Sequence, residues 1–229
     1  MNLYLKSATL AALLTSAAFC GCSGHRPLNR VAADARYSME HGKYDAAVKD
    51  YNEYVSRRPE EHEFRYEYGK ALLAAGRPVD AVRELKIAVD VRPLNDAYLD
   101  AYAEAMLAAG QKDELTSMLA RSASERGRVA DYSRMGKFAA RMGHPDEAKE
   151  ALLTAAKLDR GHSFSVQKDL ADFYGSVGDK VNEAKRLRMA YFLNPADEQV
   201  AARMKKIGEI PGPSAGLRPT ELTAVEPSK

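Results

Sequence analysis

The sequence predicts an all-α fold, built as a solenoid of about five helical hairpins. Its turn glycines, Gly42, Gly76, Gly110, Gly143 and Gly178, follow one another at intervals of 34, 34, 33 and 35 residues. Each of them ends an apolar helical pattern, and the alternating β-branched runs that indicate strands are absent. A period near 34 residues is typical of stacked repeats, in which no hairpin can bury its apolar face alone.

The composition is that of an ordinary folded protein and excludes one class of partner. Of the 229 residues, 45% are hydrophobic and 29% are charged, and the formal net charge is +2. This excess is too small to indicate nucleic-acid binding, so we expect no nucleic-acid partner.

The N-terminal residues 1–21 have the pattern of a signal peptide. Lys6 precedes an uncharged apolar stretch that is too short for a permanent membrane anchor. The run Phe19-Cys20-Gly21-Cys22 resembles the signal of bacterial lipoproteins, which implies that Cys22 becomes the first residue and carries a lipid. Ordinary signal cleavage is the alternative. Either way we expect an exported protein, and with the lipid one anchored to a membrane of the cell envelope and facing the periplasm.

The rest of the chain divides into consecutive units. We expect residues 22–27 to form a short tether, 28–208 the solenoid, and the proline-rich residues 209–229 a disordered tail. The five hairpins should cover 28–61, 62–95, 96–128, 129–162 and 163–196, and a charged capping helix should follow at 196–207.

The second unit shows the repeat pattern most clearly. Small residues on its two helices, Gly69 and Ala81, should face each other and let the backbones approach closely. The pattern resembles the tetratricopeptide repeat in the following residues: Gly69, Gly76, Ala81, Leu85, Ala88 and Pro93. This resemblance implies a right-handed solenoid of helix-turn-helix units. The third unit departs from it with Leu115 in the place of alanine, and in the fifth Ala184 comes one residue late, which predicts a longer turn.

The resemblance also implies where a partner would bind. In this family, a concave groove lined by the first helix of each unit binds proteins or peptides. The groove positions carried over to this chain are Arg36, Tyr66, Lys70, Asp100, Glu104, Ser133, Lys137, Arg141 and Lys168. Their charges alternate in blocks and could set the register of an extended ligand. The alternative is that they are ordinary solvated helix faces.

No catalytic, cofactor or metal motif is expected. Residues 212–216 match the letters of G-x-S-x-G around Ser214, but they lie in the proline-rich tail without a following histidine. The five histidines form no metal-binding pattern, and the Cys20 and Cys22 pair offers too few ligands for zinc. We therefore expect no enzyme, no cofactor and no small-molecule substrate.

These observations predict a non-enzymatic protein–protein interaction scaffold of the bacterial cell envelope. Pilus, secretion and outer-membrane assembly systems are candidate settings, because lipoproteins of this kind occur in them. The alternative is an accessory subunit or chaperone that regulates an exported enzyme.

Overall fold

The computed structural model describes residues 26–223. The expected signal peptide and Cys22 therefore lie outside the described residues. Within the described range the chain forms helices and no strands. The helices are α1 Leu28–Glu40, α2 Tyr44–Arg57, α3 His62–Ala74, α4 Pro78–Val91, α5 Asp96–Ala108, α6 Lys112–Arg126, α7 Val129–Met142, α8 Pro145–Asp159, α9 Phe164–Ser176, α10 Lys180–Leu193, α11 Glu198–Lys206 and α12 Thr220–Thr223.

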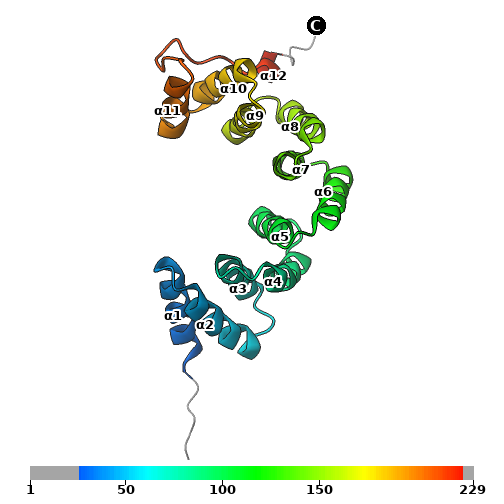
Figure 1. Cartoon of the computed structure of the whole chain (residues 1–229), viewed down its shortest axis with the longest axis vertical. Helices are drawn as coiled ribbons and strands as arrows, with labels where there is room; N and C mark the ends of the chain where they lie inside the picture. Colours follow the sequence, from blue (N-terminus) through cyan, green and yellow to red (C-terminus); the bar gives the residue numbers. More distant parts are fainter. Residues whose placement is uncertain (1–25, 224–229) are drawn as a thin grey trace, which may run out of the picture.

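The helices follow one another along an arc (Figure 1). Helix pairs such as α3–α4 and α7–α8 pack most extensively as hairpins, and each hairpin then packs on the next. The odd-numbered helices α3, α5, α7 and α9 lie on the inner side of the arc, while α4, α6 and α8 lie outside (Figure 1). Between residues 26 and 223, no helix is both long and apolar enough to cross a bilayer. The predicted all-α solenoid is confirmed.

Glycine makes the turn inside each hairpin. The five turn glycines have φ between +68° and +88°, a left-handed conformation that costs glycine nothing. The residue after each glycine donates its N–H back to the carbonyl five residues earlier, as Arg77 does to Leu72 at 2.8 Å. This bond satisfies a carbonyl at the end of the first helix, so the turn both closes one helix and aims the next.

Small residues set the distance between the helices of a hairpin. A Cβ atom on Gly69 would lie 2.4 Å from Cγ of Leu85, so α3 and α4 cross closely at this point. The predicted close crossing at Gly69 is therefore present, with Leu85 as the nearest side chain of α4, one turn after the expected and fully buried Ala81. The fourth unit repeats the arrangement, since Gly136 lies against Leu152 in the same way.

The third and fifth units differ from the others for separate reasons. In the third, α5 and α6 contact each other much less than the helices of the other hairpins, and fully buried Leu115 lies between them. In the fifth, the expected longer turn is absent, because α10 begins two residues after Gly178 as α4 does after Gly76. Glu183 takes the alanine position there, and its carboxylate accepts a hydrogen bond from Arg203 Nε at 2.8 Å.

The C-terminal residues 209–223 are folded, in contrast to the disorder that the sequence predicts for this tail. They run back along α10, where Leu217 N–H donates to the Arg188 carbonyl at 3.0 Å and Arg188 Nε donates to the Ala215 carbonyl at 2.9 Å. Beyond them, Glu221 accepts a hydrogen bond from buried Arg186 at 2.6 Å. Polar groups on α10 stabilise this segment, and contacts of this kind leave no apolar periodicity in the sequence.

Candidate functional site

The N-terminal half of the inner face carries an aromatic cluster. Tyr66 of α3 stacks on Tyr98 of α5 with ring centroids 4.6 Å apart, and Lys70 Nζ lies 5.0 Å from the centroid of the Tyr66 ring. The guanidinium of Arg36 lies 5.2 Å from the centroid of the Phe64 ring. A cavity of about 240 Å³ is lined by Arg36, Phe64, Tyr66 and Tyr98. The structure thus brings three predicted groove residues together, from the first two units.

The charged residues of the middle repeats pair with one another. Arg141 of α7 donates two hydrogen bonds to Glu104 of α5, at 2.5 and 2.7 Å, and these bonds lower the pKa of Glu104. Asp100 of α5 accepts a bond of 2.5 Å from Nε of Arg134, which is almost fully buried. The acidic and basic blocks therefore neutralise each other across neighbouring helices. They do not form the free alternating pattern that the sequence predicts.

Two further predicted residues have different surroundings. Ser133 of α7 is buried, and within the described residues its hydroxyl has no hydrogen-bond partner. It lines a cavity of about 320 Å³ between α7 and α9. Lys168 of α9 is partly exposed and donates to Asp172 on its own helix at 3.1 Å. Ser133 thus keeps a buried, unpaired hydroxyl beside this cavity, whereas Lys168 is already paired.

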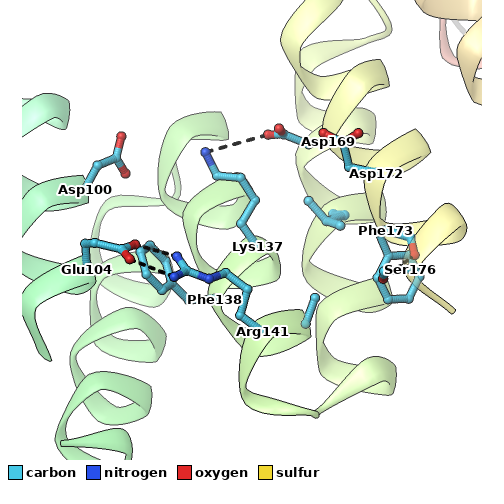
Figure 2. A pocket seen from close by; sticks show the side chains of 11 residues that line it. Asp100, Glu104, Lys137, Phe138, Arg141, Asp169, Asp172, Phe173 and Ser176 are labelled. Atoms are coloured by element: carbon cyan, nitrogen blue, oxygen red, sulfur yellow. Dashed lines mark hydrogen bonds and ion pairs between the residues drawn. The ribbon is translucent and has the colours of Figure 1, made fainter. Parts of the chain in front are cut away.

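A larger cavity of about 430 Å³ lies next to the 320 Å³ cavity, also between α7 and α9. Phe138 of α7, Phe173 of α9 and the nearly fully buried Leu152 line it with apolar atoms. Lys137 of α7 reaches across toward Asp169 of α9 (Figure 2), with 4.0 Å between Nζ and the nearer carboxylate oxygen. Because both residues line both cavities, this loose ion pair divides one continuous groove into two parts.

At the 430 Å³ cavity, two positions differ from their equivalents in the preceding repeat: Lys137 stands in the place of Glu104, and Ser176 in the place of Arg141. Glu104 and Lys137 both stand six residues before their turn glycines, and Arg141 and Ser176 both stand two residues before theirs. Between α5 and α7, Arg141 bridges the gap to Glu104. Between α7 and α9, the short side chain of Ser176 leaves the corresponding space open.

Sequence reasoning missed Tyr98, Phe138, Asp169 and Phe173. A signal for the two phenylalanines was available, since each stands five residues before its turn glycine. Asp169 gave no such signal, because its importance depends on burial. Burial raises the pKa of its carboxyl, Lys137 opposes this effect, and Asp172 adds to it. The described residues contain no group of three histidine, cysteine, aspartate or glutamate side chains placed to hold a metal ion.

The outer side of the solenoid is also hollowed. A groove of about 870 Å³ lies between α4 and α6, where the third hairpin diverges. Met106 and Tyr102 of α5 line it, and charged side chains from both outer helices surround it. Lys86 lies at this groove, is exposed, and pairs with Asp90 at 2.7 Å. Substitutions on the two sides of the solenoid can therefore separate an inner binding surface from an outer one.

Comparison with known proteins agrees with this architecture. Residues 33–93 match the sequence model of the tetratricopeptide repeat family. No curated protein matches the chain. Among solved structures, a thermophilic tetratricopeptide repeat protein of Thermus thermophilus is similar, with 19% identity over 79% of this chain and 98% of that chain and a TM-score of 0.58.

Two other solved structures share the fold at comparable levels. A tetratricopeptide repeat protein from Parabacteroides merdae is 10% identical over 79% of this chain and 72% of that chain, with a TM-score of 0.54. MamA of Desulfovibrio magneticus is 16% identical over 75% of this chain and 97% of that chain, with a TM-score of 0.51. At these identities the likeness concerns the fold alone. Residues 33–93 thus match the tetratricopeptide repeat family, and the fold of tetratricopeptide repeat structures extends over 79% of the chain.

Proposed function

We propose that this protein is a non-enzymatic scaffold that binds a partner protein or peptide along the inner side of its arc. The fold itself favours a role in protein–protein interaction. The observation that carries the proposal is the divided groove between α7 and α9, with apolar Phe138 and Phe173 beside the loose pair of Lys137 and Asp169. Apolar pockets with a few convergent polar groups are typical of binding sites.

An extended partner segment suits this groove better than a rigid domain does. The two cavities lie end to end along α7 and α9, and each has room for one or two side chains. Ser133 lines one of them, and among the described residues its buried hydroxyl has no hydrogen-bond partner. The aromatic cluster around Tyr66 supplies a second anchor farther along the arc, of the type enriched at interface hot spots.

We further propose that the protein works at the bacterial cell envelope, held to a membrane by a lipid on Cys22. Arg26, four residues later, is already fixed to the first hairpin through bonds of 2.6 Å to both Asp50 and Glu53. A fully extended chain between residues 22 and 26 spans at most about 14 Å. A lipid on Cys22 would therefore hold α1 and α2 close to the bilayer and leave the α7–α9 groove farther away.

The groove is tested by filling it with a side chain that the protein uses elsewhere. Ser176→Arg places an arginine where α7 has Arg141, and Ser56→Arg makes the same change on the exposed surface of α2. With the tagged protein as bait in solubilised envelope, we expect Ser176→Arg to lose the captured partner and Ser56→Arg to keep it. Tyr66→Ala should weaken capture by at least about 1 kcal/mol. If Ser176→Arg retains capture and Lys86→Glu loses it, the binding surface is the outer groove instead.

The membrane anchor is tested separately. We expect Cys22→Ala to move the protein from the membrane fraction to the soluble envelope fraction, with a mass that lacks the lipid. An unmodified N-terminus on the wild-type protein, measured by intact mass, would show that ordinary signal cleavage takes place.

A further inference from the structure

Asp169 differs from the other carboxylates around the larger cavity. Each of the others, Asp100, Glu104 and Asp172, accepts a hydrogen bond from an arginine of another helix. Among the described residues, Asp169 has no such bond, and its closest opposite charge is Lys137 Nζ at 4.0 Å. Its side chain is only 18% exposed. The cavity thus holds one carboxylate that is largely removed from water and weakly paired.

The surrounding charges balance the charge of this carboxylate only in part. Burial raises the pKa of Asp169, and the negative charges of Asp172 and Asp100 raise it further, while Lys137 and Lys168 oppose them. The Lys137 side chain is 44% exposed, so its ammonium is well hydrated and gains little from the present contact. A poorly solvated carboxylate, in contrast, gains much from a cation that forms direct hydrogen bonds to it.

The space beside Asp169 is lined by apolar side chains, those of Phe138, Leu152 and Phe173. The protein shows in the preceding gap how such a space is filled. There the guanidinium of Arg141 lies 5.1 Å from the centroid of the Phe138 ring and forms two bonds to Glu104. In the gap between α7 and α9 the equivalent ring, Phe173, is present, but Ser176 stands in the place of the arginine and Lys137 in the place of Glu104, so the carboxylate on offer there is Asp169 of α9.

We propose that this cavity binds an arginine side chain of the partner, with the stem between Phe138 and Phe173 and the guanidinium bonded to Asp169. The inference rests on the proposed function, because it names the chemistry of the partner segment that the inner face binds. Arginine fits better than lysine, since its planar fork forms two parallel bonds to one carboxylate and lies flat on aromatic rings. Lys137 moves out into solvent when the arginine enters.

The probe is the blocked tripeptide acetyl-Ala-Arg-Ala-amide, added to the full-length protein in detergent and followed by NMR. We expect saturable shifts of the Asp169 carboxyl and the Phe173 ring signals. The same peptide with citrulline, a neutral isostere of arginine, should bind at least about tenfold more weakly, because it lacks the charge that strengthens the bonds to Asp169. A peptide with glutamate should not bind at this cavity.

Two substitutions sharpen the test. Asp169→Asn should weaken binding of the arginine peptide at least about tenfold, whereas Asp146→Asn, on the exposed surface of α8, should leave it unchanged. Ser176→Arg should abolish binding by occupying the cavity. Equal binding of the citrulline peptide, tighter binding of the glutamate peptide, or full affinity in Asp169→Asn would each overturn the inference. The second of these would identify Lys137 as the recognition element.

The same variants separate this inference from the proposed function. If Ser176→Arg loses the partner while Asp169→Asn keeps it, the inner groove binds the partner but arginine recognition at Asp169 is wrong. If the arginine peptide binds as expected but Ser176→Arg retains full capture, the proposed binding surface is wrong.

Discussion

The close crossing of α3 and α4 makes a quantitative prediction about Gly69. An alanine there would place its Cβ 2.4 Å from Cγ and 2.8 Å from Cδ2 of Leu85, which is fully buried and has little room to move. Overpacking of this kind costs about 1–3 kcal/mol. Replacing glycine by alanine inside a helix returns about 1 kcal/mol. We therefore expect Gly69→Ala to lower the free energy of unfolding by about 0–2 kcal/mol, and each 1 kcal/mol lowers Tm by about 2–4 °C in a chain of this size.

A double-mutant cycle isolates the cause of that loss. Leu85→Ala alone should cost about 2–5 kcal/mol, because it leaves a cavity in the core. In that background the clash is gone, so Gly69→Ala should become stabilising by up to about 1 kcal/mol. Thermal unfolding followed by circular dichroism measures all four proteins. If Gly69→Ala lowers Tm by the same amount with and without Leu85, contact with Leu85 does not explain the glycine.

Gly136 provides an internal comparison. A Cβ there would lie 2.5 Å from Cγ of Leu152 and also 3.0 Å from the backbone oxygen of Ala148, which cannot rotate away. The loss should therefore be larger for Gly136→Ala than for Gly69→Ala. If Gly69→Ala lost more stability than Gly136→Ala, the distances from the added Cβ to its neighbours would not explain how tightly the two helices pack.

Further predictions concern the tail and the buried charges. Glu221→Gln removes the carboxylate that pairs with buried Arg186, so we expect a loss of about 3 kcal/mol and faster proteolysis of residues 209–223. Burial is the largest influence and raises the pKa of Glu221, but the hydrogen bond and the charge of Arg186, with a backbone hydrogen bond and Gln167, together outweigh it and lower the pKa. A carboxyl with a lowered pKa stabilises the fold at pH values above its unfolded pKa, so this stability should be lost as the pH falls below the usual glutamate range. Hydrogen exchange along α10, which should become faster at that pH, measures the loss. Asp131→Asn should cost about 3–5 kcal/mol in urea unfolding, since Asp131 is fully buried and bonded to Arg128 at 2.8 Å. An effect near zero would show that the remaining charges of that cluster rearrange.

The turns and the stacking order could be predicted from the sequence because they are local. A glycine with positive φ at a fixed interval reports a backbone conformation, whatever surrounds it. The close approach of α3 and α4 at Gly69 was also predictable, whereas the identity of the nearest side chain of α4, Leu85, depends on the angle between the helices. For the same reason the sequence marked Leu115 as unusual without showing that the third hairpin diverges there.

The candidate site was only partly predictable, because its properties depend on which charges are already paired. Arg141 and Glu104 were both expected in the groove, but they lie 37 residues apart and bind each other, so they offer little to a ligand. Lys168 is likewise paired. Tyr66, Arg36 and Lys70 do come together around one aromatic cluster, since the helical spacing within a repeat carries over to its neighbours.

What remains after this internal pairing determines what the groove can recognise. Paired surface charges contribute little to affinity, because binding a ligand must first break their existing contacts. Among the described groove residues, the Asp169 carboxylate is loosely paired and the Ser133 hydroxyl is buried without a partner, and both residues line the gap between α7 and α9. They lie beside the apolar cavity that Ser176 leaves open. We therefore propose that selectivity for a partner arises from the residues in which this repeat departs from its neighbour, while the regular part of the pattern holds them in place.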